Sequence, residues 1–235
     1  MKPYTIKQLN QINQKFYLQE AASFDKTRQN SQPGWEMLWN LVKDKLPRNI
    51  RILDVGCGNG RFGQFLSGVN NTVEYVGIDN NRYLLDQAKQ NLKGKVKAEL
   101  IKQDVILNDL KVYGQFDLVV AFGVWHHIPG RIFRQKWVEK LGEWVKPNGY
   151  LGLSIWQFGK DDRFIKRRAE KQIPNLETND FLLKWQDSDH LRYCHATNKA
   201  EVRDLVEKIS LKLVDNFEAD GKSGRLGRYL LWMKQ

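Results

Sequence analysis

Short apolar runs alternate with amphipathic segments through the middle of this 235-residue chain. Five such runs predict strands, at 52–55, 73–78, 96–101, 116–122 and 150–156. The run at 116–122 is apolar almost throughout, which is typical of a strand in a parallel sheet. Segments 81–91 and 131–145 carry apolar residues at helical spacing between the runs. This alternation predicts an α/β fold with a Rossmann-like, doubly wound sheet and helices on both faces.

The flanks of this core follow other patterns. Residues 1–20 are polar and rich in Gln and Asn, and we expect a helix or an arm with too few apolar residues to join a core. The stretch 157–190 is charged, irregular and too long for an ordinary connection, which indicates a functional insertion. Four further elements are predicted, namely helices at 35–46 and 198–209 and a final pair of strands at 210–217 and 226–233. We therefore expect a helical N-terminal extension over 1–48 and one α/β domain over 49–235.

The strongest chemical signal is the loop Asp54-Val55-Gly56-Cys57-Gly58-Asn59-Gly60 between a predicted strand and a helix. Glycines at alternate positions allow a tight turn and close approach of a ligand to the backbone. Asp79 ends the next predicted strand, where a carboxylate can accept hydrogen bonds from a ribose diol.

Two cofactor classes fit such a loop, a dinucleotide and S-adenosyl-L-methionine (SAM). A dinucleotide places its pyrophosphate at the helix N-terminus and prefers the spacing G-x-G-x-x-G. Here the spacing is G-x-G-x-G, and the carboxylate of Asp54 would repel a pyrophosphate but suit the cationic amino-acid half of SAM. The pattern therefore favours SAM.

Residues 50–156 resemble the class I SAM-dependent methyltransferases. The resemblance rests on ILDVGCGNGRF, GIDNN, QDV, FDLVVAFGVWHHI and PNGYLGLS. It implies a seven-stranded sheet, mostly parallel, with an antiparallel last strand. It also implies that Asp104 lies near the adenine amino group and Val105 near the ring. The expected cofactor-binding residues are Arg28, Asp54, Gly56, Cys57, Gly58, Asn59, Gly60, Asp79, Asn80, Asp104, Val105 and Phe122.

The flanking segments resemble the tRNA wobble-uridine carboxyl methyltransferases, the family that includes the methyltransferase domain of AlkB-type tRNA dioxygenase fusions. The similar segments are FYLQEAASFDKTRQNSQPGWEMLW, NDFLLKWQ and LRYCHATNKAEVRDLV. The family's D-x-L-x-P-W and R-Y-x-H positions are occupied by Asp180, Leu182, Trp185, Arg192, Tyr193 and His195. Lys184 replaces the family's proline, and Gly227-Arg228-Tyr229 replaces its usual Asn-aromatic pair. The resemblance implies methylation of a 5-carboxymethyl-type wobble uridine in tRNA, and in eukaryotic members a small zinc-binding activator subunit.

A carboxylate acceptor is already ionised at neutral pH, so it needs a cationic partner rather than a strong base. Arginine is the best planar partner for a carboxylate, and Arg192 is the candidate. Arg28 is expected to hold the carboxylate of SAM or of the substrate, and Tyr193 and His195 to line the acceptor pocket. His126 follows the fourth strand, where ligands bind in such sheets. Two alternatives stay open, a surface salt bridge for Arg192 and a structural role for His195.

Lys and Arg total 38 against 27 Asp and Glu, a net charge of +11, which is compatible with a polyanionic partner. Within the insertion, Lys166, Arg167 and Arg168 are candidates for RNA binding, and a solvated basic loop is the alternative. The two cysteines and four histidines lack zinc-ligand spacing, so no metal is expected. No apolar run reaches the ~20 residues of a membrane span, and the N-terminus lacks a signal-peptide core. We expect no membrane partner and a cytoplasmic location.

Two other functions fit the same sequence. One is a small-molecule O- or N-methyltransferase on the same scaffold, although the basic insertion and the net charge favour tRNA. The other is a SAM-binding module without turnover.

Overall fold

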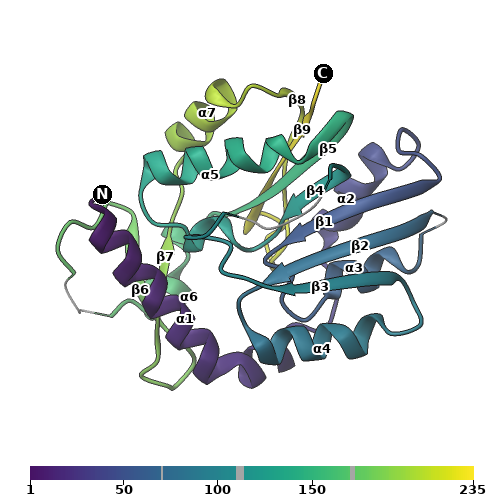
Figure 1. Ribbon diagram of the computed structural model, residues 1–235. Helices are drawn as coiled ribbons and strands as arrows, with labels where there is room; N and C mark the ends of the chain where they lie inside the picture. Colours follow the sequence, from purple (N-terminus) through teal and green to yellow (C-terminus); the bar gives the residue numbers. More distant parts are fainter. Residues whose placement is uncertain (70, 110–113, 170–172) are drawn as a thin grey trace.

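The central sheet has seven strands in the order β3-β2-β1-β4-β5-β9-β8 (Figure 1). The computed structural model describes residues 1–69, 71–109, 114–169 and 173–235. The strands are β1 (Asn49–Val55), β2 (Thr72–Asp79), β3 (Lys97–Lys102), β4 (Phe116–Ala121), β5 (Val145–Trp156), β8 (Lys212–Ala219) and β9 (Gly227–Met233). Strands β1 to β5 pair in parallel, whereas β9 is antiparallel to both of its neighbours, β5 and β8. The expected doubly wound sheet with an antiparallel last strand is confirmed.

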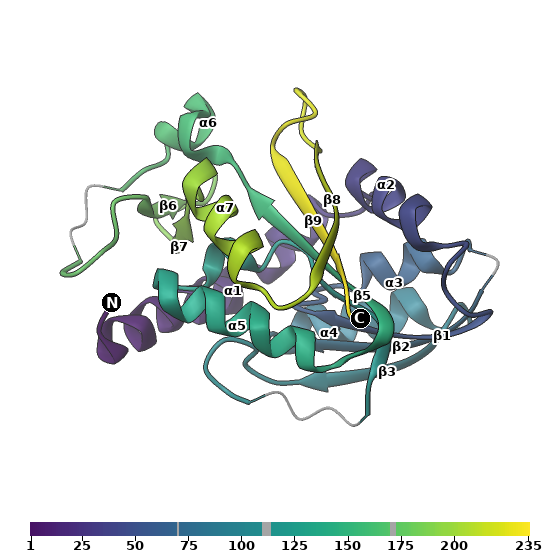
Figure 2. The same ribbon diagram turned by 90° about the horizontal axis from the view of Figure 1, so that it is seen from above.

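Helices cover both faces of the sheet (Figures 1 and 2). Alternate side chains of β1 point to opposite faces, so that Leu53 and Val55 enter one core while Ile50 and Ile52 enter the other. Helices α5 (Arg131–Glu143) and α7 (Lys199–Lys208) pack on the first face. The second face is covered by α2 (Pro33–Val42), α3 (Arg61–Leu66) and α4 (Arg82–Leu92).

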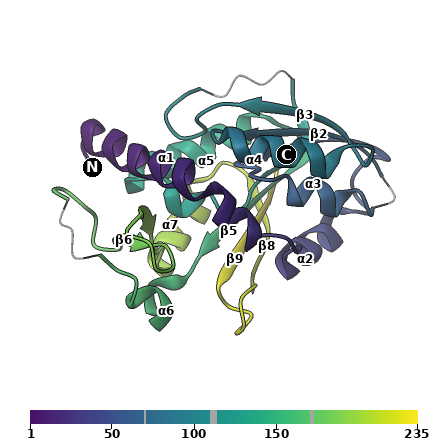
Figure 3. The same cartoon turned by 90° about the horizontal axis from the view of Figure 1, so that it is seen from below.

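Helix α1 (Pro3–Lys26) lies across the carboxyl ends of the strands (Figures 1 and 3). The expected N-terminal helix is therefore present, but it is a packed element. Leu9 and Phe16 are buried, and so are the polar side chains of Asn10 and Asn13, which hydrogen-bond to loops after the strands. Apolar periodicity alone underestimated this burial. In the part of the chain that the structure describes, no helix is long and apolar enough to cross a membrane.

The insertion is more ordered than its polar sequence indicates. It contains the short helices η2 (Phe158–Lys160) and α6 (Asp162–Ile165) and strand β6 (Asp180–Lys184), which pairs antiparallel with β7 (Leu191–His195). The expectation of irregular structure is thus wrong for β6. Leu183 and Cys194 face one apolar cluster and Leu182 and Tyr193 another, so both faces of this ribbon are buried.

The predicted turn at Pro147-Asn148-Gly149 lies inside β5 rather than before it. Asn148 has a φ of 62°, and the pairing of β4 with β5 shifts register between Phe116 and Leu118. This irregularity carries the chain from the end of α5 back into the sheet without a separate loop.

Candidate active site

One cavity of about 360 Å³ opens at the carboxyl ends of the parallel strands. Its lining residues form two groups, one at the glycine loop and one around Arg192. The loop group comprises Asp54, Gly56, Cys57, Gly58, Asn59, Asp79, Asn80, Val105 and Phe122. The arginine group comprises Tyr17, Phe24, His126, His127, Trp156 and Arg192.

The glycine loop needs glycine for its backbone shape. Gly56, Gly58 and Gly60 have φ values of 77°, 54° and 76°, in the left-handed region that side chains disfavour. A Cβ on Gly56 would lie 2.2 Å from Cγ2 of Val124, which is too close to accommodate. A Cβ on Gly58 would meet no atom within 4 Å, so the backbone there is open to a ligand.

Asp79 and Asp54 are the carboxylates of the loop group. Asp79 accepts hydrogen bonds from the backbone N–H groups of Gly58 (2.9 Å) and Asn81 (2.8 Å), which fix its orientation. Burial raises the pKa of Asp79, and these two backbone donors oppose that shift. Asp54 accepts from the hydroxyl of Tyr75 at 2.6 Å, and burial raises its pKa to about 7. The open backbone at Gly58 and two oriented carboxylates fit a ligand with a diol and an ammonium, as SAM has.

The predicted cofactor residues line the cavity with two exceptions, Gly60 and Asp104. Arg28 lines the cavity, and its guanidinium donates only weakly, at 3.3 Å, to the carbonyl oxygen and to the hydroxyl of Thr27. Asn59 uses its side-chain amide to hold the end of α1, donating to Asp25 Oδ1 (2.6 Å) and to the Arg28 carbonyl (2.9 Å). This contact places Arg28 beside the glycine loop.

The side chain of Asp104 is held by other contacts. Its Oδ2 accepts from the amides of Asn10 and Gln14 on α1, each at 2.7 Å, and its Oδ1 accepts from the backbone N–H of Ile106 at 2.8 Å. The side chain anchors α1 and does not line the cavity, and its position beside adenine stays a prediction. Val105, the next residue, does line the cavity.

Arg192 is the central residue of the arginine group. It is 2% exposed, and its guanidinium carbon lies 5.0 Å from the ring centre of Trp185 and 5.5 Å from those of Phe16 and Trp156. Its Nε has no hydrogen-bond partner, and no carboxylate of the described residues lies within 4.0 Å of its guanidinium nitrogens. The alternative of a surface salt bridge is therefore wrong. A buried cation without a counter-ion in a cavity is suited to an anionic ligand.

His126 and His127 follow β4 on the short helix η1 (Trp125–His127). The ring of His126 stacks on Trp156 with 4.3 Å between ring centres, and its Nδ1 is buried without a partner. Burial lowers the pKa of His126 well below its usual range, and the charges of His127 and Arg192 lower it further. His126 is therefore neutral at pH 7, a weak base that can still hydrogen-bond a ligand.

His127 is fixed by two hydrogen bonds. Its Nδ1 lies 2.8 Å from the carbonyl oxygen of Tyr193, which can only accept, so this nitrogen donates. Nε2 then accepts from the hydroxyl of Tyr17 at 2.9 Å. Burial, with the charge of Arg192, lowers the pKa of His127 to about 3. Tyr17 and Trp156 were not expected at the site. Trp156 could have been predicted, because it ends the fifth strand, whereas Tyr17 comes from a helix distant in sequence.

Tyr193 and His195 do not line the cavity, which corrects the expectation that they form the acceptor pocket. The alternation of β7 sends them to the face opposite Arg192. The Tyr193 hydroxyl donates to Asp180 Oδ1 at 2.7 Å, and His195 Nδ1 lies 2.7 Å from the same oxygen. His195 is therefore surrounded by buried charged groups, Asp180 and Glu201, which is consistent with a structural role.

Two groups of described side chains have ligand atoms close enough together for a metal ion, but neither is built to hold one. In the first, with His126 and Cys194, the Nδ1 of His127 carries a hydrogen and cannot ligate. The second group consists of Glu177, Asp180 and His195. Here the guanidinium of Arg134 already provides the positive charge, with Nη2 lying 2.9 Å from Glu177 Oε2.

The basic residues of the insertion differ in exposure. Lys166 is exposed and Arg167 is half-buried. Arg168 packs its guanidinium 3.7 Å from the ring centre of Phe181 and donates to the carbonyl of Gly159, so it is removed from the proposed RNA-binding set.

Comparisons with known proteins agree with this geometry. Residues 53–151 match the model of a family described as a methyltransferase domain. A tRNA (carboxymethyluridine(34)-5-O)-methyltransferase from Arabidopsis thaliana is 29% identical over 119 residues, 51% of this chain and 27% of that protein. A ubiquinone biosynthesis O-methyltransferase from Pelagibacter ubique is 24% identical over 187 residues, 75% of this chain and 71% of that protein. The chain thus spans about a quarter of the plant relative's length.

A solved SAM-dependent methyltransferase from Methanosarcina mazei has the same fold, with a TM-score of 0.66 and 21% identity over 83% of this chain and 96% of the other. The fold, the matched domain over 53–151 and the cavity at its glycine loop lead to one conclusion. Residues 53–151 form a methyltransferase domain, the chain has the fold of the solved SAM-dependent methyltransferase, and the carboxylates at its glycine loop suit S-adenosyl-L-methionine as the cofactor.

Proposed function

We propose that this methyltransferase acts on the carboxyl group of a 5-carboxymethyl-type wobble uridine in tRNA. The observation that carries the proposal is Arg192, a buried guanidinium in the cofactor cavity without a carboxylate partner among the described residues. A carboxylate acceptor supplies the missing anion, and a guanidinium can bind it through two parallel hydrogen bonds.

The other residues around Arg192 support the same chemistry. SAM supplies an electrophilic methyl group, and an ionised carboxylate attacks it without losing a proton. The neutral state of His126 is consistent with a reaction that needs no strong base. The rings of Phe16, Trp156 and Trp185 exclude water around the guanidinium, which strengthens its hold on an anion. Arg192 thus binds and orients the acceptor while Asp54 and Asp79 hold the cofactor.

Three observations support tRNA as the carrier of this carboxylate. The chain has a net charge of +11, which favours a polyanion. The Arabidopsis relative, by its name, methylates carboxymethyluridine at position 34 of tRNA. The exposed Lys166 and half-buried Arg167 offer positive charge in the insertion, beyond the carboxyl end of β5. A required activator subunit stays a prediction from family resemblance.

Kinetics of Arg192 variants test the proposal. With bulk tRNA as acceptor, Arg192→Ala should lose activity on the order of a hundredfold, the scale of removing a charged hydrogen bond in a dry site, and keep its SAM affinity. Arg192→Lys should recover only part, because an ammonium cannot make the bidentate contact. Arg203→Ala, an exposed arginine on α7, is the matched control. Wild-type turnover in both Arg192 variants would refute the role of this residue.

A small-molecule carboxylate is the second candidate acceptor. Helix α1 covers the cavity through hydrogen bonds to Asp104 and His127, and Arg192 is only 2% exposed, which suits an acceptor small enough to be enclosed. The Pelagibacter relative is, by name, an O-methyltransferase of ubiquinone biosynthesis. Failure of any RNA to accept a methyl group, with turnover in a small-molecule extract, would favour this candidate.

A further inference from the structure

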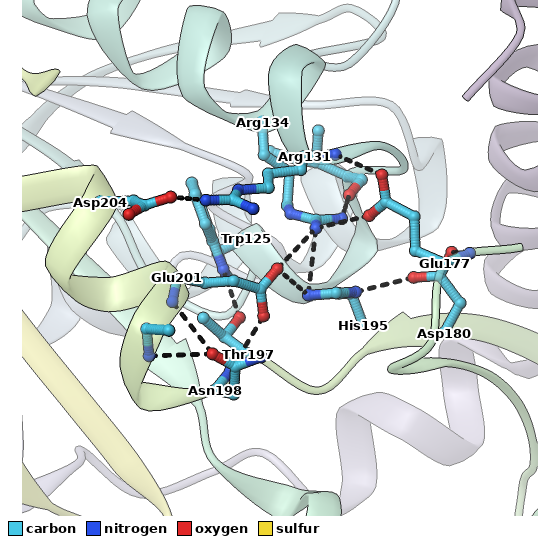
Figure 4. Close-up of polar contacts among 12 residues, drawn as sticks. Trp125, Arg131, Arg134, Glu177, Asp180, His195, Thr197, Asn198, Glu201 and Asp204 are labelled. Carbon is cyan, nitrogen blue, oxygen red and sulfur yellow. Dashed lines mark hydrogen bonds and ion pairs between the residues drawn. The ribbon is translucent and has the colours of Figure 1, made fainter.

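Figure 4 shows a cluster of ion pairs around Arg134 and His195. His195 lies on the face of strand β7 opposite Arg192, away from the cavity. We call this group the Arg134 cluster; its members are Arg134, Glu177, Asp180, His195 and Glu201. Arg134 is 0% exposed, and its Nη2 lies 2.9 Å from Glu177 Oε2 and 3.2 Å from Glu201 Oε1. None of the five residues lines the cavity.

The cluster contacts the segment that carries His126. Nη1 of Arg134 donates to the carbonyl oxygen of Ile128 at 3.0 Å, and Ile128 follows η1 directly. Beside this contact, the indole N–H of Trp125 donates to the hydroxyl of Thr197 at 2.7 Å. Both ends of η1 are therefore held by contacts outside the cavity, whereas His126 and His127 line it.

The cluster also contacts the strand that carries Arg192. His195 Nδ1 and the Tyr193 hydroxyl both lie 2.7 Å from Asp180 Oδ1, across the β6–β7 ribbon. Because side chains alternate along a strand, fixing Tyr193 and His195 on one face fixes where Arg192 emerges on the other.

We propose that Arg134 is a positioning residue for methyl transfer, whose buried cluster sets the placement of Arg192 and His126 relative to each other at the acceptor. Apolar side chains often stabilise a core as well as a buried ionic cluster does, so stability alone does not explain this cluster. Positioning does, because a displacement of about 1 Å at a reacting group can lower the rate about a hundredfold. The inference rests on the proposed acceptor role of Arg192.

Protonation of His195 is part of this arrangement. Its Nε2 lies 2.9 Å from Glu201 Oε1 and 3.0 Å from Nη2 of Arg134. Only the imidazolium donates to Asp180 and Glu201 at once; the neutral ring keeps one donor and can accept from Arg134. Burial lowers the pKa of His195, but hydrogen bonds to the two carboxylates outweigh it and raise the pKa above its usual value.

Besides Arg134, Asp180 and Glu201, the charged or titratable groups near this ring include Glu177, Tyr193 and His126. Because the pKa of His195 is raised, the protonated ring stabilises the cluster at low pH. This contribution is lost as the pH rises through the pKa that His195 has in the folded protein. The KM for the acceptor should therefore rise at high pH.

The test compares Glu201→Gln with Asp204→Asn. Glu201→Gln keeps a side-chain oxygen that can accept from the backbone N–H of Asn198 at the start of α7, but it removes the charge that faces Arg134 and His195. Asp204 pairs with Arg131 and so joins the same two helices, but it contacts neither η1 nor β7, which makes Asp204→Asn the matched control. Glu177→Gln, at the more exposed edge of the cluster, serves if Glu201→Gln does not fold.

Steady-state kinetics with bulk tRNA and a separate titration with S-adenosylhomocysteine give the readouts. We expect Glu201→Gln to raise the KM for tRNA roughly tenfold, to leave the cofactor affinity unchanged, and to shift the pH-dependent rise in KM to lower pH. Asp204→Asn should match the wild type. An unchanged KM and pH profile, or equal losses of cofactor and acceptor binding, would overturn the inference. If Arg192→Ala is also silent, the proposed function fails as well; if only the cluster variants are silent, the proposed function stands.

Discussion

At the scale of single residues, burial decides which groups of the site carry charge. Asp54 and Arg192 are both nearly excluded from solvent, yet their surroundings differ. The carboxyl group of Asp54 accepts a hydrogen bond from Tyr75 and burial raises its pKa to about 7, whereas the guanidinium of Arg192 lies among aromatic rings. The cavity thus contains the carboxyl group of Asp54, which ionises near neutral pH, and the guanidinium of Arg192, which can bind an anion.

The first prediction concerns the pH dependence of cofactor binding. If Asp54 binds the α-ammonium of the cofactor, it must be ionised, and its raised pKa makes this costly below about pH 7. The affinity for S-adenosylhomocysteine should weaken about tenfold per pH unit below about 7 and level off above it. Isothermal titration across this range measures the curve. Asp54→Asn should bind weakly without the inflection near 7; an inflection that persists in Asp54→Asn would assign it to another group.

Asp79 gives the second prediction. Its carboxylate is fixed by two backbone donors, so its free lone pairs are oriented before any ligand arrives. Asp79→Ala should weaken cofactor binding by about 1–3 kcal/mol, the range for hydrogen bonds to a charged group. Thermal denaturation of the same variant controls for folding. Unchanged affinity in a folded Asp79→Ala protein would remove Asp79 from the cofactor site.

At the scale of elements, α1 joins the site through polar contacts. Asn13 is buried; its Oδ1 accepts from the backbone N–H of Tyr193 at 2.7 Å, and its Nδ2 donates to the carbonyl of His127 at 3.4 Å. The same side chain therefore links α1 to the segments that carry His127 and Arg192. Asn81 adds a further contact, donating to the Tyr17 carbonyl at 2.7 Å.

The third prediction follows from this contact. Asn13→Ala leaves a buried backbone N–H without its acceptor, which should cost on the order of 1–3 kcal/mol of unfolding free energy. Urea denaturation measures the loss, with Gln11→Ala, at an exposed position of the same helix, as the control. Equal stability of the two variants would show that α1 packs independently of this bond.

The elements also show which features a single sequence reveals. The sheet and the glycine loop could be predicted, because buried strands need apolar runs and the turn needs glycine at fixed positions. The packing of α1 could not, since its buried face carries Asn10 and Asn13, whose partners lie far away in sequence. The five-residue strands β6 and β7 are too short for a periodic signal, and without them nothing showed that His195 faces away from Arg192.

At the scale of the whole molecule, the net charge of +11 favours binding of a polyanion such as RNA and does not bear on the fold. If RNA lies over the insertion, Lys166→Glu with Arg167→Glu should raise the KM for tRNA and flatten its salt dependence by about one to two contacts. Cofactor affinity should stay unchanged. The double reversal Lys93→Glu and Lys95→Glu changes charge equally at exposed positions just before β3, at the opposite end of the sheet. Equal effects of the two double variants would mean that only total charge matters.

The identity of the methylated atom tests the central claim most directly. The purified chain is incubated with SAM carrying a deuterated methyl group and with tRNA from cells that lack this protein, and the digested nucleosides are analysed by mass spectrometry. The account predicts label on a 5-carboxymethyl-type uridine, released by mild alkali as an ester should be, and absent with Arg192→Ala. Alkali-stable label on a ring atom or a ribose, or label in no RNA at all, would contradict carboxyl methylation of tRNA.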